Sequence, residues 1–333
     1  PTPTPQPTFA PLPQVFTLGD LPIQYQSFNN CGPANLAMLL NYWGWEGDQK
    51  TTQAVLREAR EDRNVMLSEM ADYVYANSSL HALVRYGGTL ETAKRLVAAG
   101  FPILLERGHT DPKDGWMGHY SILTTYDDQT QKVRVPDTLL GYINLTYAVL
   151  EADWTHFAGV YLVVYPPERE AEVLQLLGED AEPTQNLLRA LQQYQQRAAA
   201  SAGQQAFFDQ YAIGTLQTEL GDYLAAAASF DQAYILYNTL EVRQRPWRML
   251  WYQVGPYVAY YQTGRYQDLV TLANITLNDT TEDSLPETWL WGARAYAAMG
   301  DNDNAIHFYE QALFWYPEWP VARQELAALQ AQP

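Results

Sequence analysis

The strand-forming pattern of this chain stops at Pro166-Pro167, and no other feature constrains the fold as strongly. Before this point, short runs of β-branched and aromatic residues are mixed with helical segments. After it, the chain is rich in alanine, leucine and glutamine, and its apolar residues recur at helical spacing. The 333 residues suffice for two domains, each with its own core. We therefore predict an α+β domain over residues 15–167 and an all-α domain over residues 168–333.

The predicted α+β domain places its helices first and an antiparallel sheet after them. Hydrophobic spacing and capping residues predict helices over residues 33–43, 51–60, 68–75 and 89–99. The expected N-caps are Thr51, Ser68 and Thr89, because a hydroxyl oxygen accepts from the free N–H groups of a first turn. The expected strands cover residues 102–106, 119–126, 132–135 and 160–165, with a hairpin turn at residues 127–130.

Glycine-centred turns divide the all-α half at Gly221, Gly264 and Gly300, which are 43 and 36 residues apart. Small, aromatic and proline residues surround the first and third of these turns: Gly214, Ala226, Phe230, Ala233, Ala293, Ala305, Tyr309, Ala312 and Pro317. This pattern resembles tetratricopeptide repeats, which are about 34 residues long and in which small side chains let two antiparallel helices approach closely. The resemblance implies a solenoid that binds a substrate or a protein partner, and a generic helical bundle is the alternative.

The chain is strongly acidic, with 20 Lys and Arg against 38 Asp and Glu and a net charge of −18. Such a surface repels phosphate backbones and anionic lipid headgroups, so nucleic acid is not an expected partner. The longest apolar runs are also too short to span a bilayer.

The first 13 residues contain six prolines, which lack the N–H group that a helix or a sheet needs. We interpret residues 1–14 as an extended linker or tail. A tail that begins without methionine suggests that an export signal or membrane anchor precedes it, and an ordinary flexible terminus is the alternative. The expected location is therefore extracytoplasmic, either secreted or tethered to the cell surface. Because polyproline segments dock on aromatic-lined grooves, self-assembly through this tail is a further expectation.

Cys31 is the only cysteine, which excludes an internal disulfide and a cysteine-based zinc site. It stands in the sequence Asn-Asn-Cys-Gly-Pro, immediately before a helix that Pro33 is suited to start. At that position the free N–H groups and the helix dipole favour a thiolate over a thiol. We therefore interpret Cys31 as a nucleophile, with a buried structural cysteine as the alternative.

Two further residues of catalytic type follow Cys31 at the ends of hydrophobic runs. His119 opens one run, and Asp137 closes the next. With Gln26 a few residues before Cys31, this order resembles the C39-like cysteine peptidases of the papain-like clan, which include the double-glycine leader peptidases. The resemblance covers residues 22–165.

The resemblance implies a papain-like fold and a role for each of these residues. Cys31 matches the nucleophile, His119 the general base and acid, and Asp137 the residue that orients the imidazole. Gln26 matches the glutamine of the oxyanion hole, and Gln24 is a competing candidate in the same loop. The implied reaction proceeds through a thioester, needs neither metal nor cofactor, and ends in hydrolysis or in acyl transfer to an amine.

The resemblance extends to extracytoplasmic members that carry tetratricopeptide repeats, so the implied substrate is a peptide or protein. A rival interpretation is an inactive homologue that serves as a structural or scaffolding protein at the cell surface. His109, in a polar loop near the expected site, is interpreted either as a substrate contact or as a solvated histidine. His81, His156 and His307 show no metal-ligand spacing, so no metal site is expected from them.

Overall fold

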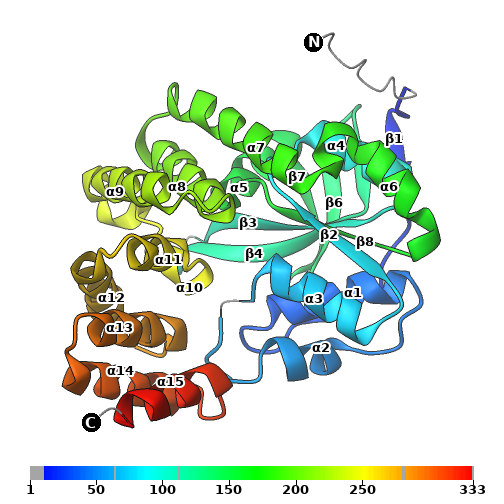
Figure 1. Cartoon of the computed structure of the whole chain (residues 1–333). Helices are drawn as coiled ribbons and strands as arrows, with labels where there is room; N and C mark the ends of the chain where they lie inside the picture. The colour runs from blue at the N-terminus through cyan, green and yellow to red at the C-terminus, as the bar shows by residue number, and fades with distance from the viewer. Residues whose placement is uncertain (1–10, 64, 112, 280–282, 332–333) are drawn as a thin grey trace. The chain divides into compact units, whose positions relative to one another are not determined.

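The computed structural model describes residues 11–63, 65–111, 113–279 and 283–331 (Figure 1). Most of the predicted tail, residues 1–10, lies outside the described residues, and the predicted self-assembly through it does too. The chain forms two compact units. The first unit comprises residues 1–56, 66–109 and 118–200, and the second comprises residues 57–65, 110–117 and 201–333.

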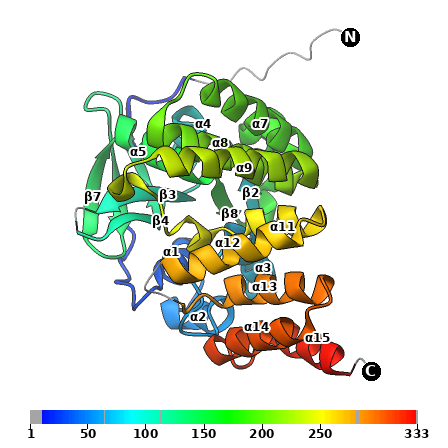
Figure 2. The same cartoon turned by 90° about the vertical axis from the view of Figure 1, so that its left-hand side faces the viewer.

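The first unit mixes helices and strands, as the sequence predicts. Its α-helices are α1 (Cys31–Tyr42), α2 (Gln49–Leu56), α3 (Leu67–Asn77), α4 (Leu90–Ala98), α5 (Tyr147–Trp154), α6 (Glu170–Leu177) and α7 (Pro183–Ala198). Helix α2 contacts both α1 and α3, and the three are grouped together in both views (Figures 1 and 2).

Of the expected N-caps, only Thr89 is confirmed, since its hydroxyl accepts from the N–H of Thr92 at 3.1 Å. Thr51 is wrong as a cap because the carboxylate of Asp48 accepts from the N–H groups of residues 50 and 51, so α2 starts earlier. Ser68 is also wrong, because α3 is capped at Met66, whose N–H donates to the side chain of Glu69 at 2.6 Å.

The strands form two four-stranded sheets. One sheet has the order β1-β5-β6-β7, formed by β1 (Val15–Thr17), β5 (Thr125–Asp127), β6 (Lys132–Asp137) and β7 (Gly141–Thr146). The other has the order β2-β8-β3-β4, formed by β2 (His81–Arg85), β8 (Tyr161–Tyr165), β3 (Ile103–Asp111) and β4 (Gly115–Leu123). Pairing is antiparallel in β1–β5, β5–β6, β6–β7, β2–β8 and β3–β8, which confirms the predicted α+β class with an antiparallel sheet.

The strand predicted over residues 119–126 is two strands in different sheets. It divides at the buried Thr124, whose carbonyl accepts from the N–H of Leu18, so that the chain passes from β4 into β5 and pairs there with β1. The predicted turn is confirmed, because the carboxylate of Asp127 accepts from the N–H groups of Gln129 and Thr130.

One core joins both sheets to α4, α5 and α6. Val173 and Leu177 of α6 belong to this core and are almost fully buried. Helix α7 is held by Asn186, whose amide group both accepts from the N–H and donates to the carbonyl of Tyr86, each at 2.9 Å. These contacts explain why the first compact unit extends to Ala200, beyond the domain boundary predicted after Pro167.

The second unit is helical after residue 201. Its helices are α8 (Gly203–Glu219), α9 (Tyr223–Thr239), α10 (Met249–Tyr252), α11 (Gly255–Gln262), α12 (Tyr266–Asp279), α13 (Pro286–Ala298), α14 (Asn302–Trp315) and α15 (Pro320–Gln330). Helices α11 to α15 follow one another as layers coloured from yellow to red, each in contact with the next (Figures 1 and 2).

Close helix pairing in the second unit depends on small residues that face aromatic rings. A Cβ on Gly214 of α8 would lie 2.7 Å from the ring of Phe230 on α9, and a Cβ on Gly292 of α13 would lie 2.6 Å from the ring of Phe308 on α14. The three glycine-centred turns that the sequence predicts are present, and Gly221, Gly264 and Gly300 are left-handed there, with φ of 75°, 71° and 79°. The predicted all-α architecture of this half is therefore confirmed.

Candidate active site

Cys31 is the first residue of α1 and is partly exposed, whereas the nine residues that follow it are buried. Pro33 occupies the first turn, where its missing N–H costs no hydrogen bond. The side-chain amide of Asn35, one turn along, donates to the carbonyl of Cys31 at 2.9 Å and to that of Tyr120 on β4 at 3.3 Å. The start of α1 is thereby fastened to the strand that carries His119, with the sulfur at the positive end of the helix.

His119 of β4 and Asp137 at the end of β6 come from different sheets and are both buried. Nε2 of His119 lies 3.0 Å from Oδ2 of Asp137. The other carboxylate oxygen, Oδ1, accepts from the N–H groups of Leu139 at 2.8 Å and Leu140 at 2.9 Å. Burial alone would raise the pKa of Asp137, but His119 and these two N–H groups hold it well below its usual 3.8. The carboxylate is therefore ionised and fixed in position.

His119 also shares a hydrogen bond with the side chain of Cys31. Since Nε2 faces Asp137, Nδ1 is the ring nitrogen left for the sulfur. Burial alone would lower the pKa of His119, but the hydrogen bonds and charges of Asp137 and Cys31 outweigh burial and raise it from 6.5 to about 9. The arrangement therefore favours an imidazolium beside the sulfur at neutral pH.

The structure separates the two glutamines that compete in the sequence. Both ends of the Gln24 side chain are engaged, with Nε2 donating to Asn41 at 2.9 Å and Oε1 accepting from the N–H of Gln49 at 2.7 Å. Gln26 accepts from the hydroxyl of Thr138, next to Asp137, through Oε1 at 2.5 Å. Its Nε2 has no partner among the described residues. Among the described residues, Gln26 therefore has a side-chain N–H donor available for a ligand, whereas both polar ends of Gln24 are already hydrogen-bonded.

Arg107 of β3 is a buried cation at the site that the sequence analysis missed. Its Nη2 lies 3.8 Å from Oδ2 of Asp137, its Nη1 lies 3.1 Å from Oδ2 of Asp153, and its Nε donates to Ser121 at 2.9 Å. Burial raises the pKa of Asp153 from 3.8 to about 6, and Arg107 opposes that rise. The guanidinium therefore links Asp137 to α5 and adds positive charge behind the carboxylate.

Glu106, next to Arg107 in β3, is a second buried group that was missed. Burial raises the pKa of Glu106 well above 4.5, the negative charge of Cys31 adds to the rise, and a hydrogen bond with Tyr120 opposes it. Burial therefore favours the neutral carboxylic acid form of Glu106, which opposes a second negative charge beside Cys31. The available sequence signal was the adjacent charged pair Glu106 and Arg107 at the end of the strand predicted over residues 102–106.

The remaining histidines lie apart from this arrangement or at its edge. The ring of His109 lies 5.8 Å from that of His119, edge to face, which places it beside the site. Burial lowers the pKa of His156 to about 3, and His81 pairs with Glu170 at 3.1 Å. In the described part of the chain, no group of three or more His, Cys, Asp or Glu residues could hold a metal ion.

Within the same described residues, no helix is both long enough and apolar enough to cross a membrane.

Comparison with known families divides the chain in two. Residues 18–163 match the model of the C39-like peptidase family, and residues 286–318 match that of a tetratricopeptide repeat. No curated protein matches the chain.

Two solved structures are similar to part of this chain. One is a double glycine motif protease from an AMS/PCAT transporter in complex with the leader peptide, with 20% identity, a TM-score of 0.33, and coverage of 44% of this chain and 92% of that one. The other is a C39-like peptidase from Bacillus anthracis, with 17% identity, a TM-score of 0.37, and coverage of 46% and 98%. On the family matches, residues 18–163 form a C39-like peptidase domain, and residues 286–318 form a tetratricopeptide repeat.

Proposed function

We propose that this protein cleaves peptide bonds through a Cys31–His119–Asp137 triad, with Gln26 as an oxyanion donor. The observation that carries the proposal is the position of His119, whose Nε2 lies 3.0 Å from Asp137 and whose ring also interacts with the side chain of Cys31. A cysteine peptidase needs this order of contacts, because the imidazole must both pair with the thiolate and be held in one orientation.

The chemistry follows from these contacts. The Cys31 thiolate attacks the substrate carbonyl and forms a C–S bond, while the His119 imidazolium gives its proton to the leaving amine as the C–N bond breaks. The neutral imidazole then takes a proton from water, whose oxygen attacks the thioester, and the C–S bond breaks. The proton on His119 restores the ion pair. Asp137 keeps the ring in one orientation throughout and stabilises its charged form.

The developing oxyanion needs hydrogen-bond donors that are already in place. Nε2 of Gln26 and the backbone N–H of Cys31 at the start of α1 supply them in this proposal. Donors of this kind are worth about 3 kcal/mol in the transition state.

Tetratricopeptide repeats are protein-interaction modules, so the helical half is proposed to recruit the substrate or a partner. We also propose an extracytoplasmic setting. It is supported by the Pro- and Thr-rich composition of residues 1–14, which is typical of an extended linker. Antibody labelling of intact cells against lysed cells tests this setting, and signal from lysed cells alone would contradict it.

A digest of a mixed peptide library tests the peptidase activity. Mass spectrometry in ¹⁸O-labelled water should show new C-termini that carry one ¹⁸O with the native chain and none with Cys31→Ser. Both chains should have the same melting temperature, so that a loss of activity is not a loss of fold. Products joined to an amine would indicate acyl transfer, and unchanged peptides with the native chain would favour the scaffolding alternative.

A further inference from the structure

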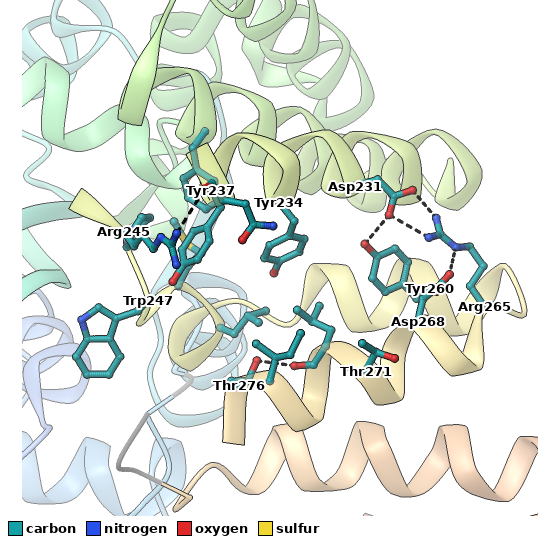
Figure 3. A pocket seen from close by; sticks show the side chains of 17 residues that line it. Asp231, Tyr234, Tyr237, Arg245, Trp247, Tyr260, Arg265, Asp268, Thr271 and Thr276 are labelled. Atoms are coloured by element: carbon teal, nitrogen blue, oxygen red, sulfur yellow. Dashed lines mark hydrogen bonds and ion pairs between the residues drawn. The ribbon is translucent and has the colours of Figure 1, made fainter. Parts of the chain in front are cut away.

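The second unit contains a pocket between α9 and α12, away from the residues of the matched repeat (Figure 3). Its volume is about 370 Å³, within the range of small-ligand sites, and it is partly open to solvent. The segment between α9 and α11 forms one end through Pro246, Met249 and Leu250. This segment is longer than the turns that join α8 to α9, α11 to α12 and α13 to α14, and it provides part of the pocket wall.

Most of the pocket wall is apolar or aromatic. It includes Phe207, Tyr234, Tyr237, Trp247, Met249, Leu250, Tyr260, Leu272 and Ile275. A wall of this composition gains free energy by taking an apolar side chain out of water.

The two carboxylates that line the pocket, Asp231 and Asp268, already accept hydrogen bonds from neighbouring side chains. The two oxygens of Asp231 accept from Arg265 at 2.7 and 3.0 Å, and Oδ1 also accepts from the hydroxyl of Tyr260 at 2.8 Å. Asp268 accepts from Nε of Arg265 at 2.7 Å. These residues form one connected group in Figure 3, so they offer no free carboxylate to a ligand.

Two donors, in contrast, can each take a further acceptor. The hydroxyl of Tyr234 is buried without a hydrogen-bond partner in the described part of the chain, and it points from α9 into the space above α12 (Figure 3). Burial raises the pKa of Tyr234, so the hydroxyl keeps its proton. Arg245 donates only to the carbonyls of Asn238 and Leu240, at 3.4 and 3.2 Å, and contacts no carboxylate among the described residues.

We propose that this pocket binds the C-terminal residue of a peptide, with its apolar side chain against the aromatic wall and its carboxylate at Tyr234 and Arg245. A buried donor without a partner is costly, and a carboxylate would satisfy both donors through charge-assisted hydrogen bonds. A ligand without an acceptor would leave the Tyr234 hydroxyl unsatisfied. The open side of the pocket leaves room for the preceding residues of the peptide.

Calorimetric titration of the full chain with Cys31→Ser tests this proposal while keeping the probe peptides whole. The probes are acetyl-Gly-Gly-Phe with a free carboxylate, the same peptide as its amide, and acetyl-Gly-Gly-Gly with a free carboxylate. We expect the phenylalanine acid to bind at least about tenfold more tightly than either of the others. Equal binding of acid and amide, or binding of neither, would overturn the proposal.

Arg243 supplies a matched control, because it is exposed, carries the same charge and is not part of the pocket wall. Arg245→Gln should weaken binding of the acid at least about fivefold and remove the preference for acid over amide, and Arg243→Gln should change neither. Equal losses of affinity in the two variants would show that binding depends only on the overall charge of the protein, and this would overturn the proposed site.

Tyr234→Phe provides a second test that does not depend on a loss of fold. It removes a hydroxyl that has no partner, so the melting temperature of the free protein should stay the same or rise. Affinity for the acid should still fall at least about fivefold, and unchanged affinity would contradict the assigned contact. Because every measurement uses the Cys31→Ser chain, the pocket can fail while the proposed peptidase activity stands, and the reverse also holds.

Discussion

Nε2 of His119 and Oδ2 of Asp137 lie 3.0 Å apart although the two residues belong to different sheets. The antiparallel register of β6 and β7 pairs Asp137 with Gly141, so a tight turn follows the carboxylate and aims two N–H groups at it. The same carboxylate that orients the imidazole is therefore fixed by backbone that leaves it little freedom to move.

Asp137→Asn should shift the alkaline limit of peptidase activity to lower pH. The pKa of His119 is raised to about 9, so the imidazolium that protonates the leaving amine persists up to about that pH. Without the charge of Asp137 the pKa of His119 falls towards 6.5, and the alkaline limb should move down by at least about one pH unit. The measurement is the pH profile of kcat/KM in both chains, and superimposable profiles would argue against the role of Asp137.

The stability of the protein should depend on pH through the same histidine. A pKa raised from 6.5 to about 9 contributes stability that is fully present below pH 6.5 and is lost as the pH rises to 9. The loss over this window should be at most about 3 to 4 kcal/mol. Urea unfolding at pH 6 and pH 9 measures it, and His119→Ala should show a smaller decline than the native chain; equal declines would contradict this account.

Gln26→Ala and Gln24→Ala should have different effects. Loss of Gln26 should lower kcat/KM by roughly 10² and leave alkylation of Cys31 nearly unchanged, because an oxyanion donor acts on the transition state. Gln24→Ala removes bonds to Asn41 and Gln49, so it should lower the unfolding free energy by about 1–3 kcal/mol. Reversed effects of the two substitutions would assign the oxyanion donor to Gln24.

Glu106→Gln should leave alkylation of Cys31 between pH 6 and 7 within about twofold of the native rate. Burial raises the pKa of Glu106 and favours its neutral form, so we expect the substitution to change little of the charge beside Cys31. Intact-mass measurement of the alkylated protein over time gives the rate. A rise of about tenfold would show that Glu106 is charged in the native chain and repels the thiolate.

The sequence predicted the parts of the fold that depend on local signals. The Cys31–Pro33 helix start, the Thr89 cap and the Asp127 turn follow from chemistry within a few residues, and the structure has all three. Strands β1 and β2 were not predicted, because they are short or carry polar residues and pair with strands distant in the sequence. Strand β7, which pairs with the neighbouring β6, was not predicted either.

The sequence predicted residues of the candidate site only where they belong to a recognisable motif. Cys31 was indicated by its place at a helix start, and His119, Asp137 and Gln26 by one resemblance; the catalytic roles of all four stay a prediction. Glu106 and Arg107 match no motif, and a charged pair in a strand becomes informative only when the fold buries both. The boundary of the first unit at Ala200 could not be predicted from local sequence either, because α6 and α7 pack against residues that are distant in the sequence.

Alkylation of Cys31 by iodoacetamide at pH 6 is the measurement that tests the central claim most directly, and a single cysteine means that every added mass reports on this residue. At this pH a free cysteine is almost entirely a thiol, so a thiolate paired with His119 should react at least about tenfold faster than glutathione. His119→Ala should remove most of that advantage. A rate equal to that of glutathione, unchanged by His119→Ala, would contradict the proposed triad.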